Sequence, residues 1–120
     1  MAIVRYLVTD VGSNLNFYTK NFGFTVKQSW ENFAKIQLED LELWISGPKA
    51  SAAKAMPDGK KPIPGGWNRI VIKVDNIEEF VEGLKKEGVT MRNEILSGVG
   101  GKQIVIEDPS GNPIEIFEEK

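Results

Sequence analysis

Histidine and cysteine are both absent from this sequence of 120 residues. Without imidazole or thiol groups, the chain cannot build a nucleophilic triad with a histidine base, a histidine-ligated transition-metal site or a zinc–thiolate site. Disulfide bonds are excluded for the same reason. Any metal ion that the protein bound would rest on oxygen ligands alone.

The net charge is also small, at −2. Lysine and arginine total 15 residues and aspartate and glutamate 17, and both kinds are spread along the chain. No basic patch or acidic tail therefore indicates a nucleic-acid or membrane-surface partner. No apolar run is long enough to span a bilayer, and the chain is strand-like from Ile3 onward, so we expect a cytoplasmic protein. A small molecule or another protein remains as the partner.

The first part of the sequence, residues 1–46, predicts a β-α-β-β-β module. Residues 2–9 alternate as a strand does, and Ser13 is placed to cap a helix over residues 13–22 that ends at Gly23. Three strand-like runs follow, at residues 24–30, 33–38 and 41–46.

The same order recurs in residues 67–120. A strand over residues 68–74 leads into an amphipathic helix over residues 77–87 that ends at Gly88. Strand-like runs follow at residues 89–93, 94–96, 102–106 and 114–117. Two copies of one module predict a single α+β domain over residues 1–120.

Residues 47–66 connect the two modules and have a different character. They are rich in Gly, Pro, Lys and Ala and show no sustained periodicity. Such a segment is either a plain linker or a lid that closes over a ligand, and both interpretations remain open.

Strand alternation predicts that each sheet has one apolar face under its helix and an opposite face of mixed character. The residues expected on the mixed faces are Ile3, Arg5, Leu7, Lys35, Gln37, Glu42, Trp44, Arg69, Val71, Lys73, Gln103, Val105, Glu115 and Phe117. A surface that combines charged, amide and aromatic groups suits a ligand cleft better than a core.

Glu115 is the most informative of these residues. The turn residues 108–113 (DPSGNP) precede a short strand, and Glu115 is the acid in its apolar run 114–117 (IEIF). A carboxylate in a sheet is solvated, paired with a cation, or placed to meet a ligand.

Together these features resemble the vicinal-oxygen-chelate superfamily, which includes glyoxalase I, extradiol dioxygenases, fosfomycin-resistance enzymes and bleomycin-resistance proteins. The resemblance is carried by residues 6–10 (YLVTD), 16–18 (NFY), 22–24 (FGF), 69–75 (RIVIKVD), 84–88 (LKKEG) and 108–117 (DPSGNPIEIF). It implies paired modules curled into half-barrels around a ligand cavity, with helices on the outer face, and a homodimer.

The resemblance also implies where a metal would bind in related enzymes. Its ligands would fall on Ile3 and Arg69, in the first strand of each module, and on Glu42 and Glu115, in the last strand of each module. Only the two acids are ligands here, so no cofactor is expected, although an oxygen-bound divalent metal stays open as the alternative. An arginine ~4 Å from a carboxylate attracts it by about 4 kcal/mol before desolvation. We therefore expect Arg69 to pair with Glu115 in place of a metal, and Arg5 to do the same for Glu42.

Three functions follow as hypotheses. The first is a metal-independent small-molecule-binding protein with a dimeric concave cleft. Its ligand-binding residues would be Arg5, Gln37, Glu42, Trp44, Trp67, Arg69, Gln103, Glu115 and Phe117. In this hypothesis the aromatic rings stack on the ligand, although a single tryptophan is also typical of a core or sheet edge.

The second hypothesis is a glyoxalase- or dioxygenase-like enzyme. It would use Glu115 as the catalytic base with Arg69 as electrostatic stabiliser, or use Glu42 and Glu115 with an oxygen-bound Mg²⁺ or Mn²⁺. The third is an interaction module whose cleft is filled by its own side chains.

Overall fold

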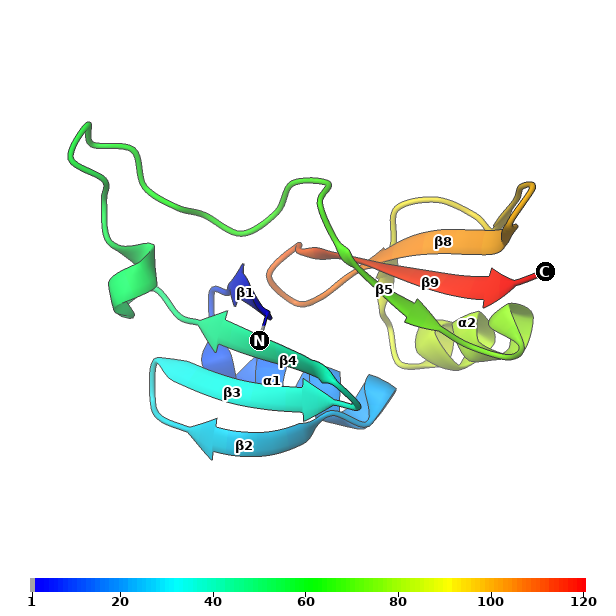
Figure 1. Ribbon diagram of the computed structural model, residues 1–120, viewed down its shortest axis with the longest axis horizontal. Helices are drawn as coiled ribbons and strands as arrows, with labels where there is room; N and C mark the ends of the chain where they lie inside the picture. Colours follow the sequence, from blue (N-terminus) through cyan, green and yellow to red (C-terminus); the bar gives the residue numbers. More distant parts are fainter. Residues whose placement is uncertain (1) are drawn as a thin grey trace. The chain divides into compact units, whose positions relative to one another are not determined.

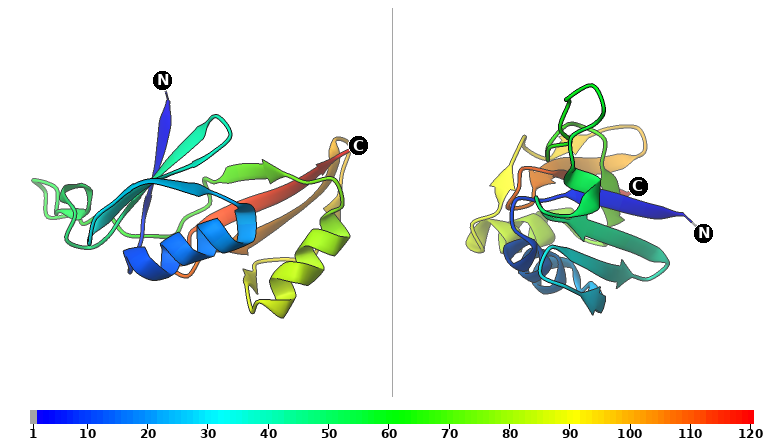
Figure 2. Two further views of the ribbon diagram at one scale, coloured as in Figure 1. Left: turned by 90° about the horizontal axis from the view of Figure 1, so that it is seen from below. Right: turned by 90° about the vertical axis from the view of Figure 1, so that its left-hand side faces the viewer.

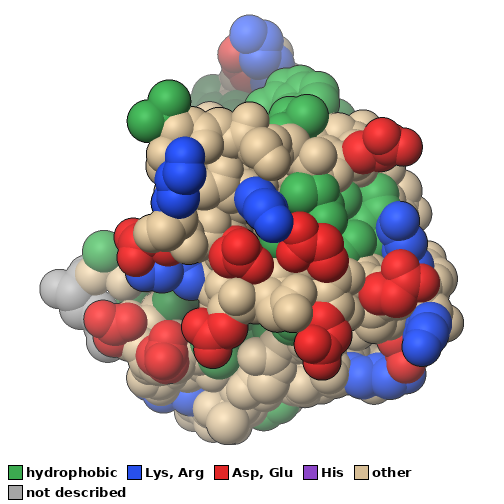
Figure 3. All heavy atoms as spheres, turned by 90° about the vertical axis from the view of Figure 1, so that its right-hand side faces the viewer, with side chains coloured by type: hydrophobic (Ala, Val, Ile, Leu, Met, Phe, Trp, Pro, Cys, Tyr) green, Lys and Arg blue, Asp and Glu red, His purple; other side chains and the backbone are tan. Residues whose placement is uncertain are grey.

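Two short α-helices and two β-sheets make up the protein, and the computed structural model describes residues 2–120 (Figure 1). The chain divides into two units, the first ending at Gly65 and the second beginning at Gly66, and each is described by itself. Within residues 2–120, neither α-helix is long and apolar enough to cross a membrane. Acidic and basic side chains are interspersed on the face drawn in Figure 3, as the small net charge suggests.

The first unit is a four-stranded sheet with one helix. Its elements are β1 (Ile3–Leu7), α1 (Val11–Phe22), β2 (Thr25–Ser29), β3 (Phe33–Leu38) and β4 (Leu41–Ser46). The strand order is β1-β4-β3-β2, with β1 parallel to β4 and the other pairs antiparallel. Helix α1 packs on β3 and β4. Ile36, Leu43 and Ile45 are fully buried in this unit.

The start of α1 differs from the prediction. Asp10 is the N-cap, because its Oδ2 accepts a hydrogen bond of 2.8 Å from the backbone N–H of Ser13. Ser13 therefore lies inside the first turn, and the helix begins before the predicted residue. The predicted end is confirmed, because Gly23 adopts the left-handed conformation with φ 76°.

The second unit repeats this arrangement. Its elements are β5 (Ile70–Lys73), α2 (Ile77–Lys86), β6 (Thr90–Met91), β7 (Leu96–Ser97), β8 (Gly101–Glu107) and β9 (Pro113–Glu119). The strand order is β5-β9-β8-β6 with β7 also paired to β8, and β5 is parallel to β9. Helix α2 contacts β9, and Figure 2 shows it lying along one side of the sheet. Asn76 caps α2 by accepting a hydrogen bond of 3.1 Å from the backbone N–H of Glu79.

The strand order of the two units confirms the α+β fold of two repeated β-α-β-β-β modules. Neither sheet of residues 2–120 closes into a barrel. The strand registers also confirm the predicted faces. Arg5, Trp44 and Lys35 lie side by side in one row across the first sheet, and Val71, Glu115 and Val105 do so in the second.

The connection between β4 and β5 contains one short 3-10 helix, η1 (Ser51–Ala53). Ala53 is buried, and the N–H of Gly47 donates to the carbonyl oxygen of Asn32 over 2.8 Å, so the first part of the connection packs on its own unit. Gly65 and Gly66 both have positive φ, 115° and 88°, which favours glycine at the point where the units meet in sequence.

Candidate functional site

Glu115 forms the centre of a polar cluster on the second sheet. Its Oε1 accepts hydrogen bonds from Nε and Nη2 of Arg69 at 3.0 and 2.8 Å. The amide nitrogen of Gln103, oriented so that it faces the carboxylate, donates to both oxygens at 3.2 and 3.1 Å. The Glu115 side chain is only 12% exposed and that of Arg69 28%. The expected pairing of Arg69 with Glu115 is therefore present, with Gln103 as a third member.

Strand register places Ile3 opposite Glu42 and Val71 opposite Glu115. Ile3 lies seven residues before the helix N-cap Asp10, and Arg69 lies seven residues before the helix N-cap Asn76, so Ile3 and Arg69 precede their helices by the same distance. Arg69 lies two residues before Val71 and reaches Glu115 along the same face, because strand side chains repeat with a period of two.

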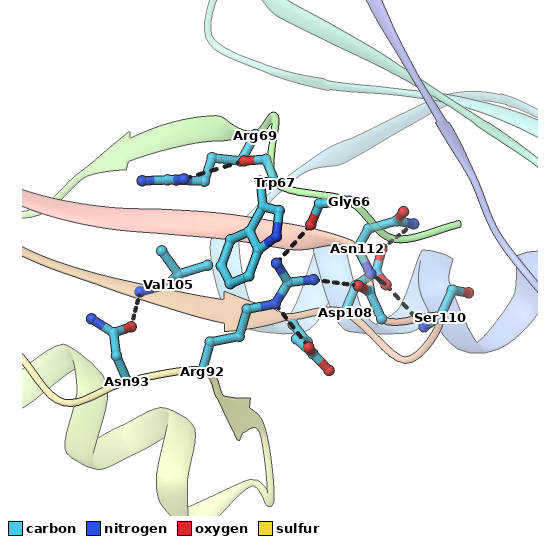
Figure 4. Close-up of polar contacts among 11 residues, drawn as sticks. Gly66, Trp67, Arg69, Arg92, Asn93, Val105, Asp108, Ser110 and Asn112 are labelled. Atoms are coloured by element: carbon cyan, nitrogen blue, oxygen red, sulfur yellow. Dashed lines mark hydrogen bonds and ion pairs between the residues drawn. The ribbon is translucent and has the colours of Figure 1, made fainter. Parts of the chain in front are cut away.

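The turn before β9 fixes the strand that carries Glu115. Oδ1 of Asp108 accepts the backbone N–H groups of Ser110 and Asn112 at 2.9 Å each, and its Oδ2 accepts Nδ2 of Asn112 at 3.0 Å (Figure 4). Gly111 has φ 85°, which its lack of a side chain permits. The predicted turn is thus held by a buried carboxylate and not by the backbone alone.

The ring of Trp67 packs on the guanidinium group of Arg92, a residue that was not predicted from the sequence to belong to the site. The Arg92 guanidinium carbon is 4.5 Å from the centre of the Trp67 ring (Figure 4). Arg92 also donates to the carbonyl oxygens of Gly66 and Gly111 at 2.6 and 3.0 Å, and to Glu107 at 2.8 Å. Nη1 of Arg69 donates to the backbone oxygen of Trp67 at 3.2 Å, and Trp67 is 68% exposed, so its ring is held on Arg92 and is still open to solvent.

Phe117 follows Glu115 on the same face of β9. It lies opposite Lys73 on β5 and Gln103 on β8 and is half-buried. The second unit therefore brings together five of the predicted ligand-binding residues: Trp67, Arg69, Gln103, Glu115 and Phe117.

In the first unit, Glu42 pairs with a lysine and not with Arg5. Nζ of Lys27 donates to Oε1 of Glu42 at 2.7 Å, and Nε1 of Trp44 donates to Oε2 at 2.6 Å. The hydrogen bond from Lys27, followed by that from Trp44, lowers the pKa of the Glu42 carboxyl below its ordinary value, against the opposing effect of burial. The expected Arg5–Glu42 pair was wrong.

The sequence did not predict the ion pair between Lys27 and Glu42, because no side chain of β2 was expected in the site. Its strand has an irregular register against β3 between Val26 and Gln28, which is where Lys27 lies. Alternation from the buried Phe24 places Lys27 on the same face as Glu42, and this was the available signal.

Trp44 contacts both cations of its row. The guanidinium carbon of Arg5 is 5.1 Å from the ring centre, and Nζ of Lys35 is 4.8 Å from it. Phe33 meets the ring edge-on at 5.5 Å and in turn stacks on Trp30 at 5.5 Å. The fourth predicted residue of this unit, Gln37, donates instead to the backbone oxygen of Glu39 at 2.8 Å.

These contacts do not fit a divalent metal site. Both candidate ligands, Glu42 and Glu115, already accept hydrogen bonds from cationic side chains. Residues 2–120 contain no group of three or more His, Cys, Asp or Glu side chains that could hold a metal ion. A cation bound at either acid would meet the positive charge of Lys27 or Arg69.

Comparison with known proteins decides the family. The model of the Glyoxalase/Bleomycin resistance protein/Dioxygenase superfamily matches residues 1–116. The chain belongs to this superfamily. The superfamily includes lyases and dioxygenases, and the match spans both modules.

Individual members of the superfamily are similar over most of the chain. A protein named lactoylglutathione lyase from Escherichia coli O157:H7 is 28% identical over 120 residues, covering 94% of this chain and 87% of its own length. Among solved structures, the fosfomycin resistance protein FosX from Listeria monocytogenes has a TM-score of 0.77 at 16% identity, with 100% of this chain and 93% of that one covered. A lactoylglutathione lyase from Agrobacterium tumefaciens has a TM-score of 0.72 at 17% identity, with coverage of 98% and 92%. These structures are similar in fold.

Proposed function

We propose that this member of the superfamily is a small-molecule-binding protein that needs no metal. In this proposal it acts in the cytoplasm as a homodimer and holds its ligand in a concave cleft against the mixed faces of the sheets. The contacts would come from Arg5, Gln37, Glu42, Trp44, Trp67, Arg69, Gln103, Glu115 and Phe117.

The observation that carries the proposal is the contact between Arg69 and Glu115. The guanidinium group donates twice to Oε1 of a carboxylate that is 12% exposed. A fixed positive charge so close supplies the partner that a bound cation would otherwise provide for the carboxylate. The exposed Trp67 beside it offers an aromatic surface on which a flat ligand could stack.

An enzyme is the second candidate, and the relatives named lactoylglutathione lyase favour it. In this alternative Glu115 is the general base. Among residues 2–120, Arg69 and Gln103 donate to Oε1 and the Gln103 amide donates to Oε2, so Oε2 is the oxygen that would accept a substrate proton. Arg69 would then stabilise negative charge that develops on the substrate.

A thermal-shift screen of small molecules in the presence of EDTA tests the first candidate. A ligand of the proposed cleft raises the unfolding temperature, and the increase is lost in Arg69→Ala and Trp44→Ala. Lys54→Ala, in the connection between the units, is the matched control and should keep the increase. A hit that persists in both site variants places the ligand elsewhere.

An activity assay separates the two candidates. Formation of lactoylglutathione by the purified protein, lost in Glu115→Gln, would establish the enzyme and overturn the proposal of binding alone. The predicted result is no formation above that of the Glu115→Gln variant.

A further inference from the structure

We propose that Arg5 and Lys35, on either side of Trp44, form a binding site for an oxyanion, a carboxylate or phosphate group of the ligand. The inference rests on the proposed function, because it uses the same sheet face, and it adds the chemical class of the ligand. Lys35 is a new member of the site.

Strand register brings the two cations together. Arg5 on β1 and Lys35 on β3 both lie opposite Trp44 on the intervening strand β4. Neighbouring strands are about 4.8 Å apart, so the two backbones are separated by about 10 Å. Both cationic groups turn inward to the indole, at 5.1 and 4.8 Å from its centre. The Trp44 ring therefore draws in one positive group from each of the two neighbouring strands.

Charge on this sheet is unbalanced. Its four strands contain three cationic residues, Arg5, Lys27 and Lys35, and a single acid, Glu42. Lys27 neutralises Glu42 through the 2.7 Å contact. Lys35 is close enough to lower the pKa of the Glu42 carboxyl through its charge, after the larger effects of Lys27 and Trp44, but it forms no ion pair with it.

Arg5 and Lys35 thus keep their hydrogen-bond donors available. Within residues 2–120 both side chains contact aromatic rings, and neither forms an ion pair with a carboxylate. Arginine carries five N–H donors and lysine three, and a cation–π contact leaves most of them available to an oxyanion. Arg5 is exposed and Lys35 half-buried, so solvent or a ligand can reach both.

The second sheet shows the contrast. Lys73 pairs with Glu119 at 3.3 Å and Lys102 with Glu78 at 2.6 Å, so both lysines of its strands have an acidic partner. Arg5 and Lys35 of the first sheet differ from these lysines, because within residues 2–120 they contact one tryptophan ring and have no acidic partner. An oxyanion is the ligand group that matches them, because it accepts several charge-assisted hydrogen bonds at once.

Nuclear magnetic resonance of the full chain tests the site with defined probes. The ¹H–¹⁵N signal of the Trp44 indole is followed at low salt during titration with sodium benzoate, with inorganic phosphate, and with neutral benzamide. The expected result is a saturable shift with at least one of the anions and none with benzamide. Saturation by benzoate alone assigns a carboxylate, and saturation by phosphate alone assigns a phosphate group.

Two variants and one control locate the binding. Arg5→Gln and Lys35→Gln should each raise the dissociation constant at least tenfold, while Lys54→Gln, the same charge change in the connection, should leave it within twofold. The remaining signals of the same spectra report whether each variant is folded. If neither anion produces a saturable shift, or if both variants bind as the parent does, the oxyanion site is refuted. Should a hit of the thermal-shift screen still depend on Arg69 in that case, the proposed function stands without this site.

Discussion

The Arg69–Glu115 pair should be energetically coupled, and a double-mutant cycle measures the coupling. At the observed N–O distance of 2.8 Å, two unit charges attract by about 1.5 kcal/mol in water and about 6 kcal/mol at an effective dielectric constant of 20. Desolvation of the largely buried carboxylate and the ordering of two long side chains offset most of the larger value. We therefore expect a net coupling of about 1–2 kcal/mol at low ionic strength.

The assay is urea unfolding of Arg69→Met, Glu115→Gln and the double variant, with the free energy of unfolding extrapolated to water. A second pair serves as the control, because Lys73 on β5 and Glu119 on β9 also form an ion pair on this sheet, but their side chains are 63% and 68% exposed. Their cycle should give about 0–0.5 kcal/mol. A coupling for Arg69 and Glu115 no larger than that of the control pair would refute the view that this contact stands in for a bound cation.

Three further predictions concern stability. Hydrogen bonding from Lys27 lowers the folded-state pKa of Glu42. The stabilisation that the ionised Glu42 carboxylate gives to the folded state is therefore complete above the unfolded-state pKa and is lost as the pH falls through the folded-state pKa. The free energy of unfolding should therefore fall less between pH 7 and pH 3 in Glu42→Gln than in the parent; an equal fall would contradict this. Asn76→Ala removes the N-cap of α2 and should cost about 1 kcal/mol in urea unfolding, whereas no loss would mean that the cap is dispensable. Gly101→Ala should cost about 2–4 kcal/mol in the same assay, because φ is 151° and the added Cβ would overlap the backbone oxygen of Glu118; a stable variant would mean that this approach relaxes freely.

The sequence predicted the repeated modules because each strand and helix carries its own periodicity. The glycine at the end of α1 and the turn at Asp108 have local signatures, so they could be predicted without any tertiary contact. The Arg69–Glu115 pair followed from the family resemblance, which places both residues where related enzymes bind a metal, and from the alternation of side chains, which puts both on one face.

Contacts that depend on exact register could not be predicted in this way. Lys27 reaches Glu42 from a strand with an irregularity that the sequence does not mark, and it displaces Arg5 from the expected pair. Arg92 lies after the short strand β6 and finds Trp67 only through the tertiary fold. Asp10 and Ser13 are both suitable N-cap residues, so composition alone did not distinguish them.

Metal binding tests the central claim most directly. Elemental analysis of the purified protein is combined with tryptophan fluorescence during titration with Mg²⁺, Mn²⁺, Ni²⁺ and Zn²⁺. The predicted result is no stoichiometric metal and no saturable change, because Lys27 and Arg69 already neutralise Glu42 and Glu115. One equivalent of bound metal that disappears in Glu42→Gln or Glu115→Gln would contradict the account.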